Sequence, residues 1–425
     1  MMSAFSVLFG FALVSIVFHR TKYLQPFALL AIVVSALFTY VDASQIQLFE
    51  FVLEFVLFAF LLHEKEETTQ TQTLFLGASS LLLLEAKSVL DFLIAFEALS
   101  IISVVVVSFI QTKEQAEGAI KMFIAGSIAT GILFLGVVFY VMGGGVLLAP
   151  LAHDGTFFMS VGSFVMLAGV FYKLTIVPFH GWAIDSYALM RHTHAGLLSG
   201  VAKTVVALSV FKIFSPFLLE HLQLSVPLLA TLAIVTMTVG NFLALFSTKI
   251  ARILSFSSIA HAGYILVAFV AVKSSYADEG ILYMAIAYIF MQSGAFLALD
   301  ILRKEYGIVT LEDIKGLASY NPLIAALFTL QLLSLAGIPL LAGFLAKAVV
   351  FYAGVDAGLW WLVLVALLNS ALSVGYYAWI VKHIYFDATT KERVQTKTEY
   401  LKMASQILLA GATVVFGLFA GLVFG

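Results

Sequence analysis

The chain has 425 residues, of which 62% are hydrophobic and only 11% are charged, and its mean hydropathy is +1.08. These values exclude a soluble globular protein and indicate an integral membrane protein. The formal net charge of -2 implies no nucleic-acid partner, and the absence of cysteine excludes disulfides, thiolate metal sites and cysteine-ligated iron–sulfur clusters.

Apolar stretches that can cross a bilayer recur along the whole chain. A spanning helix needs about 20 mainly apolar residues. The first stretch has no basic region before it, so we expect a retained helix rather than a cleaved signal peptide. The sequence predicts an all-α polytopic membrane protein with about fourteen transmembrane helices. Their approximate bounds are 3–18, 26–42, 47–63, 72–86, 88–110, 115–143, 156–184, 187–214, 225–248, 251–273, 280–302, 322–353, 359–385 and 401–424.

Basic residues are concentrated in the loops that follow the odd-numbered helices. By the positive-inside rule these loops are cytoplasmic, which puts both termini on the periplasmic or equivalent outer face. We expect a prokaryotic inner membrane. The basic residues are Arg20, Lys22, Lys65, Lys113, Arg191, Lys249, Arg303, Lys304, Lys315, Lys382, Lys391, Arg393 and Lys397.

The middle of the chain is predicted to contain two five-helix units, 72–214 and 225–385. The segment 1–71 precedes them with three helices, and 386–425 follows with a loop and the last helix. Because five is an odd number, the second unit must be inverted in the membrane relative to the first. Inverted repeats are typical of transporters.

The fourth helix of each unit, the seventh and twelfth of the chain, contains a proline and a nearby lysine. Pro178 follows Lys173 in 156–184, and Pro339 precedes Lys347 in 322–353. Proline removes a helical hydrogen bond, so both helices are predicted to be broken. Unwound backbone can line a polar path at membrane depth.

Three lysines, Lys173, Lys203 and Lys347, each lie inside an apolar stretch long enough to cross a bilayer and close to a proline or glycine break. An ammonium near the bilayer centre costs roughly 2.5–3.5 kcal/mol on insertion scales, so each is a functional candidate by default. An apolar environment disfavours the charged form of a lysine and a nearby carboxylate favours it, so moving the carboxylate can release a proton. The alternative for each lysine is a structural ion pair.

Glu97 and His261 are the other candidates for proton transfer. Glu97 lies near the middle of its helix, with no opposite charge within a turn, so it needs a partner on another helix or a proton. Its alternative is a neutral carboxyl that serves packing. An imidazole titrates near neutral pH, so His261 can relay protons, although a lone membrane histidine often only hydrogen-bonds its neighbours.

Other polar residues favour a structural interpretation. Glu50 and Glu54, one turn apart, are expected at a solvated helix end. Asp300 is spaced for helix-surface pairs with Arg303 and Lys304. His192 and His194 are two residues apart and do not share a helix face, so no metal site is expected there. Lys121 is placed to snorkel to the cytoplasmic surface.

The stretch 248–264, which contains His261, resembles antiporter-like membrane subunits of respiratory complex I and of Mrp cation/proton antiporters. The stretch 332–347 ends in Lys347 rather than glutamate. With this lysine, the stretch is most similar to subunit N of NADH:quinone oxidoreductase, which is called subunit 2 in mitochondria. Further matches are Glu97, 117–121, 172–182 and Lys203, whereas the loop 185–194 departs from the family pattern.

The resemblance implies roles for all five candidates. Glu97 and Lys173 would form the charge pair of the first half-channel, and Lys203 would be the connecting lysine. His261 would belong to the central relay, and Lys347 would be the terminal lysine of the second half-channel. The chain would be a proton-translocating subunit in the membrane arm of a complex I-like enzyme. It would hold no cofactor, with flavin, iron–sulfur clusters and quinone in partner subunits, and it would contact further antiporter-like subunits.

Alternative functions are a subunit of an Mrp-type sodium/proton antiporter or of a membrane-bound hydrogenase, a stand-alone cation/proton transporter, and a structural spacer that has lost pumping. The set of intramembrane charges argues against a spacer. No substrate-sized polar cluster accompanies these charges, which disfavours a stand-alone transporter. The lysine at the end of the stretch 332–347 favours subunit N over Mrp.

Overall fold

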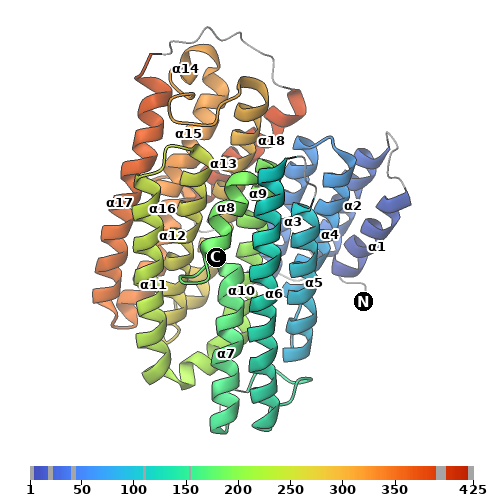
Figure 1. Ribbon diagram of the computed structural model, residues 1–425, viewed down its shortest axis with the longest axis vertical. Helices are drawn as coiled ribbons and strands as arrows, with labels where there is room; N and C mark the ends of the chain where they lie inside the picture. Colours follow the sequence, from blue (N-terminus) through green and yellow to red (C-terminus); the bar gives the residue numbers. More distant parts are fainter. Residues whose placement is uncertain are drawn as a thin grey trace.

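The computed structural model describes residues 4–17, 23–39, 45–108, 112–152, 155–388 and 399–419, and within them the chain is helical (Figure 1). The only β-type pairing in these ranges is one isolated bridge between Lys249 and Thr310. The helices are α1 (Ala4–Val17), α2 (Leu24–Thr39), α3 (Gln45–His63), α4 (Glu67–Leu84), α5 (Val89–Val107), α6 (Lys113–Met142), α7 (Phe157–Leu174), α8 (Gly181–Leu189), α9 (His192–Gly196), the π-helix η1 (Leu197–Ala202), α10 (Lys203–Glu220), α11 (Leu222–Leu245), α12 (Ile250–Val270), α13 (Ala277–Tyr306), α14 (Leu317–Tyr320), α15 (Pro322–Ala336), α16 (Ala342–Asp356), α17 (Trp360–Tyr385) and α18 (Tyr400–Leu418).

The all-α membrane fold is confirmed, and each of the fourteen predicted spans corresponds to one helix or to consecutive helices. Ten segments of the described chain are long and apolar enough to cross a membrane. The two predicted interruptions are present, between α7 and α8 and between α15 and α16. The two-unit division at 72–214 and 225–385 stays a prediction. Both termini and the basic residues Arg20, Lys22, Lys391, Arg393 and Lys397 lie outside the described ranges.

Each interrupted helix ends in a left-handed residue rather than at its proline. α7 ends at Leu174, and its cap, Thr175, has φ 60°. α15 ends at Ala336 and is capped by Gly337 with φ 86°. Glycine adopts this conformation without steric cost, whereas a β-branched residue does so only when its surroundings hold it there. The break at Thr175 therefore depends on tertiary contacts more than the break at Gly337 does.

A third interruption was not predicted. The span expected over 187–214 is divided into α9, η1 and α10, with the π-turn directly before Lys203. Single π-turns inside a helix are rare overall, and those that occur often lie at functional sites.

α12 and α13 form the centre of the bundle, and their spans are completely buried by the rest of the chain. α1 and α2 lie at one side of the molecule and α11 and α17 at the other (Figure 1). α18 packs against α3, α13 and α16, so it joins the N-terminal helices to the second half. An ion pair of 3.0 Å between Lys65 and Glu399 ties the two chain segments beside this contact, and the hydrogen bond from Lys65 lowers the pKa of Glu399.

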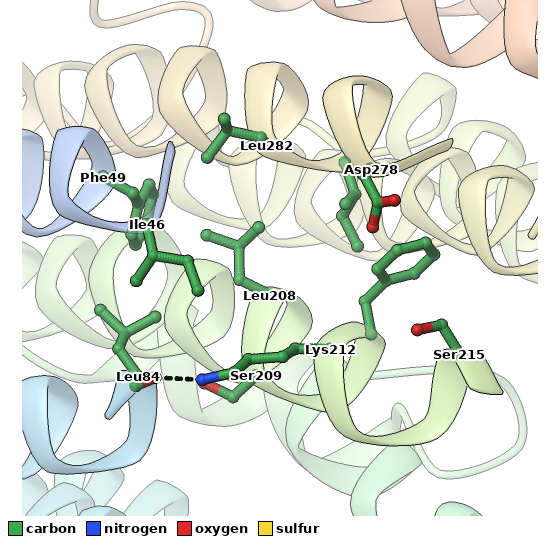
Figure 2. Close-up of a pocket in the computed structure, with 11 residues that line it drawn as sticks. Ile46, Phe49, Leu84, Leu208, Ser209, Lys212, Ser215, Asp278 and Leu282 are labelled. Atoms are coloured by element: carbon green, nitrogen blue, oxygen red, sulfur yellow. Dashed lines mark hydrogen bonds between the residues drawn. The ribbon is translucent and has the colours of Figure 1, made fainter. Parts of the chain in front are cut away.

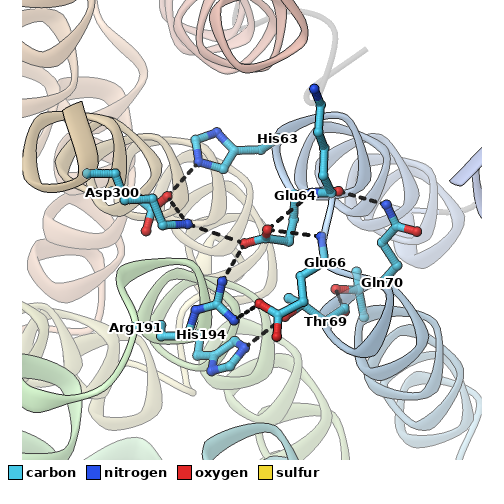
Figure 3. A network of polar contacts seen from close by, with 11 residues as sticks. His63, Glu64, Glu66, Thr69, Gln70, Arg191, His194 and Asp300 are labelled. Atoms are coloured by element: carbon cyan, nitrogen blue, oxygen red, sulfur yellow. Dashed lines mark hydrogen bonds and ion pairs between the residues drawn. The ribbon is translucent and has the colours of Figure 1, made fainter. Parts of the chain in front are cut away.

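A largely buried polar network joins the end of α3, the start of α4, α9 and α13 (Figure 3). Arg191 donates to Glu64 at 3.2 Å and to Glu66. Asp300 pairs with Lys304 at 2.9 Å and with His63 at 3.1 Å. The predicted pairing of Asp300 with Lys304 is confirmed. Its assignment to a helix surface is wrong, because Asp300 is 3% exposed and His63 packs over it.

The prediction for Glu50 and Glu54 is also wrong. Both are buried in the chain rather than placed at a solvated helix end. Glu54 accepts hydrogen bonds from Ser35 and, at 3.3 Å, from Thr39 on α2. The packing of α2 against α3 decides this burial, and nothing in the local sequence of α3 indicates it.

Candidate functional site

Lys203 connects the break in α7 to the central helix α12. It is the first residue of α10 and is 0% exposed. Its Nζ donates to Thr175 Oγ1 at 2.7 Å, to Ser258 Oγ at 2.6 Å and to the Ser258 carbonyl at 3.0 Å. An ammonium has three donors, so these contacts can satisfy all of them. Lys203 thus contacts the left-handed residue at the end of α7.

Lys347 meets the second broken helix. Its Nζ donates to the carbonyls of Leu335 and Ala336, at 3.1 and 3.0 Å, and to Ser370 Oγ at 3.1 Å. The last carbonyls of a helix have no partner within the helix and carry partial negative charge, so a cation at this place is stabilised. The ammonium also lies 5.1 Å from the ring centre of Tyr264, a cation–π distance. The helix break thus provides a site for a charge inside the membrane.

His261 lies on α12 between the two lysines. It is 0% exposed, and both Lys203 and Lys347 act on it electrostatically. Its Nδ1 lies 2.9 Å from the Ser257 carbonyl, whereas its buried Nε2 makes no hydrogen bond of good geometry and the Leu335 backbone is a further polar neighbour of the ring. A buried polar atom without a partner is costly and calls for an explanation. A nitrogen that binds a proton only during part of a cycle is one such explanation.

Glu97 and Lys173 approach each other but do not form a direct ion pair. Each acts electrostatically on the other. Glu97, on α5, accepts a hydrogen bond from Thr130 Oγ1 on α6 at 3.0 Å. Lys173, on α7, is 5% exposed, and its Nζ has no hydrogen-bond or ion-pair partner among the residues described. Because the two charges are close and unbonded, small helix movements can change their interaction.

The structure adds three residues that the sequence analysis missed: Thr175, Ser258 and Tyr288. Tyr288 on α13 is 0% exposed, and its ring centre is 5.0 Å from that of His261. The Ser258 hydroxyl is a polar neighbour of this phenol. Hydroxyl residues are common in packed membrane helices, so no signal in the sequence marks these three.

A further polar cluster continues from Lys347 through Tyr264. Asn241 Nδ2 donates to the Tyr264 hydroxyl at 3.1 Å and to the Asn369 carbonyl at 3.0 Å. The Tyr376 hydroxyl donates to Asn241 Oδ1 at 3.1 Å. Buried hydroxyl and amide groups thus join α11, α12 and α17.

A cavity of about 300 Å³ lies between α3, α4, α10 and α13, away from this row of residues (Figure 2). Apolar side chains such as Phe49 and Leu208 line most of it. Lys212 Nζ donates to the carbonyls of Leu84 and Ala86, at 3.0 and 3.1 Å, and so caps the end of α4. This cation has a structural role that is separate from the three candidate lysines.

The arrangement can bind and pass protons. Buried and half-buried groups able to carry a proton lie on α5, α7, α10, α12 and α16, and hydroxyl groups surround the lysines on α10 and α16. Within the described ranges, no group of three or more His, Asp or Glu side chains is placed to hold a metal ion.

Comparison with known proteins gives a consistent result. The family described as NADH:quinone oxidoreductase/Mrp antiporter, transmembrane region, matches residues 86–373. F(420)H(2) dehydrogenase subunit N of Methanosarcina mazei is 32% identical over 369 residues, which cover 83% of this chain and 74% of that protein. NADH-quinone oxidoreductase subunit N 1 of Solibacter usitatus is 33% identical over 378 residues, or 86% of this chain and 77% of that protein.

A solved structure has the same fold. A chain of respiratory complex I from Thermus thermophilus superposes with a TM-score of 0.84 at 23% identity, covering 99% of this chain and 98% of that chain. All five predicted site residues fall inside the range that matches the family. The chain therefore belongs to the NADH:quinone oxidoreductase/Mrp antiporter transmembrane family.

Proposed function

We propose that this chain is a proton-translocating membrane subunit of a complex I-like NADH:quinone oxidoreductase. The observation that carries the proposal is the pair of buried lysines, Lys203 and Lys347, each in contact with the end of a broken helix, with both acting electrostatically on the buried imidazole of His261. The chain contributes to the enzyme as part of a translocase, and the redox reaction takes place in partner subunits.

Proton transfer in this proposal proceeds by successive exchanges along α12. The ammonium of Lys203 gives up a proton and becomes a neutral amine, and His261 accepts the proton at Nε2, with Tyr288 as a bridge. His261 then passes the proton to a neutral Lys347. The pair of Glu97 and Lys173 controls the input, because separating the two charges favours release of the lysine proton. Quinone reduction in neighbouring subunits supplies the driving force.

Co-purification in mild detergent tests this function. Flavin-containing and iron–sulfur proteins should accompany the chain, together with further antiporter-like membrane subunits. Recovery with small membrane proteins alone would contradict the proposal. It would favour the second candidate function, a subunit of an Mrp-type sodium/proton antiporter, because the matched family also includes Mrp antiporters. The relative from Methanosarcina mazei is named for an F(420)H(2) dehydrogenase, so the soluble proteins recovered should also identify the electron donor.

We also propose that the chain itself holds no redox cofactor. The absence of cysteine and of a dinucleotide fingerprint supports this. The separated subunit should show no flavin, haem or iron absorbance, whereas the intact complex should show it. A stoichiometric cofactor in the separated subunit would require a different role.

Tyr288→Phe is expected to slow proton translocation about tenfold, because it removes one bridging hydroxyl and keeps the ring against His261. The measurement is acidification of inverted vesicles driven by the complete complex. Tyr140→Phe is the matched control, since this tyrosine is equally buried but contacts Ala152, far from α12. Equal rates for Tyr288→Phe and the unmodified chain would remove Tyr288 from the path.

Both termini are proposed to lie on the outer face of a prokaryotic inner membrane, because basic residues are concentrated in the loops after odd-numbered spans. A periplasm-active reporter fused after Gly425 should be active, and the same reporter inserted in the loop at Lys315 should be silent. Activity of a cytoplasmic reporter after Gly425 would overturn this orientation.

A further inference from the structure

A second cavity, of about 220 Å³, is formed where α6, α8, α9, α12 and α13 end near the loops after odd-numbered spans. Three cationic side chains, Lys249, Arg252 and Arg303, line it together with His192. No carboxylate belongs to its lining. Its volume is several times the ~30 Å³ that a water molecule occupies in the liquid. It is separate from the row of candidate proton-binding residues and lies beside the network at Arg191, whose Asp300 acts electrostatically on His192.

The positive charge of this cavity is only weakly balanced within the described part of the chain. Arg252 has a single ion pair, with Asp185 at 3.9 Å, and Asp185 binds Lys121 more closely at 2.6 Å. Neither Lys249 nor Arg303 has an ion-pair partner among the residues described. Three cations around one cavity repel each other, so an anion between them is stabilised.

Two further features of the lining favour an anion. His192 is 3% exposed, and its Nδ1 is buried without a hydrogen-bond partner. Ala251 brings the first turn of α12 to the cavity, and the N-terminal end of this 21-residue helix carries partial positive charge. The cavity therefore combines guanidinium groups, an ammonium, an imidazole and a helix N-terminus.

We propose that this cavity binds a phosphate group. Arginine forks match phosphate oxygens in two-point hydrogen bonds, and lysine adds a point charge. The cavity lies at the ends of membrane helices, and basic pockets between such helices bind phospholipid headgroups. The phosphate can come from an anionic lipid or from free phosphate in solution, because both present the same oxygens. The residue His192 comes from the loop 185–194, which departs from the family pattern.

The test uses the full chain in nanodiscs of phosphatidylglycerol and phosphatidylcholine in equal amounts, followed by native mass spectrometry. One phosphatidylglycerol per chain should be retained. The double variant Arg252→Gln/Arg303→Gln should weaken retention about 30-fold, from about 1 kcal/mol for each cation near the membrane surface. Lys315→Gln/Lys382→Gln is the charge-matched control on the same face and should have no effect. Arg252→Lys/Arg303→Lys keeps the charge and should retain more lipid than the glutamine variant.

A second arm distinguishes the two sources of phosphate. Inorganic phosphate at millimolar concentration is added to the lipid-loaded chain and to each variant. If it displaces the lipid from the unmodified chain, the site accepts free phosphate; if it does not, the site requires the lipid. Equal retention of both lipids with no effect of phosphate would overturn the proposal. Equal loss in the Lys315→Gln/Lys382→Gln control would overturn it too.

Discussion

Lys347→Met is expected to lower proton translocation about a hundredfold, which is typical for loss of a group that transfers protons. Methionine keeps an apolar stem beside Tyr264 and removes the ammonium. The carbonyls of Leu335 and Ala336 then lose their donor, and each buried acceptor without a partner costs about 1–3 kcal/mol. Vesicle acidification should therefore fall, and the thermal stability of the chain should decrease as well.

The variant Lys347→Arg separates helix capping from proton transfer. A guanidinium can still donate to the end of α15, but it stays protonated and cannot pass a proton on. We expect stability to recover while translocation stays low. Lys315→Met, which removes a half-buried lysine outside the membrane helices that pairs with Glu312, is the matched control and should change neither. Full translocation in Lys347→Arg would show that Lys347 only caps the helix.

Glu97→Gln and Lys173→Met are each expected to lower translocation about a hundredfold, and the double variant is expected to be no slower than either single variant. The reason is that the two charges act on each other without a direct bond, so removing either leaves the other in one protonation state. Glutamine can still accept the hydrogen bond from Thr130, so the local packing is kept. The three variants are measured in the same vesicle assay.

The matched comparison combines Glu97→Gln with Lys382→Met, a lysine on α17 that pairs with Asp387. The losses in that double variant should be additive, because the sites share no partner. If the fold-losses in translocation rate of Glu97→Gln and Lys173→Met multiply in their double variant in the same way, the two residues do not work as a pair. Thr130→Val should give an intermediate loss, since it removes the hydrogen bond that the Glu97 carboxyl accepts from Thr130 Oγ1.

The predictable part of the candidate site was its set of charged residues. Lys173, Lys203 and Lys347 are recognisable because an ammonium is costly in an apolar span, and this cost applies whatever the helix contacts. The partners Thr175 and Ser258 were not predictable, because a hydroxyl is inexpensive at any depth. The separation of Glu97 and Lys173, which act on each other electrostatically without a direct ion pair, was not predictable either, since helix packing sets the distance between α5 and α7.

The sequence by itself determined the membrane class, the fourteen spans and the two interrupted helices. Hydropathy and the geometry of proline act over neighbouring residues, so a linear reading captures them. Only the tertiary structure decided the π-turn before Lys203, the burial of Glu54 and the position of Tyr288 against His261. Each of these three features depends on which helix packs against the residue concerned. At Gly200, for example, the side chain of Ser293 on α13 occupies the space that a Cβ would need. Such contacts join residues far apart in the chain, and packing around α12 and α13 sets them.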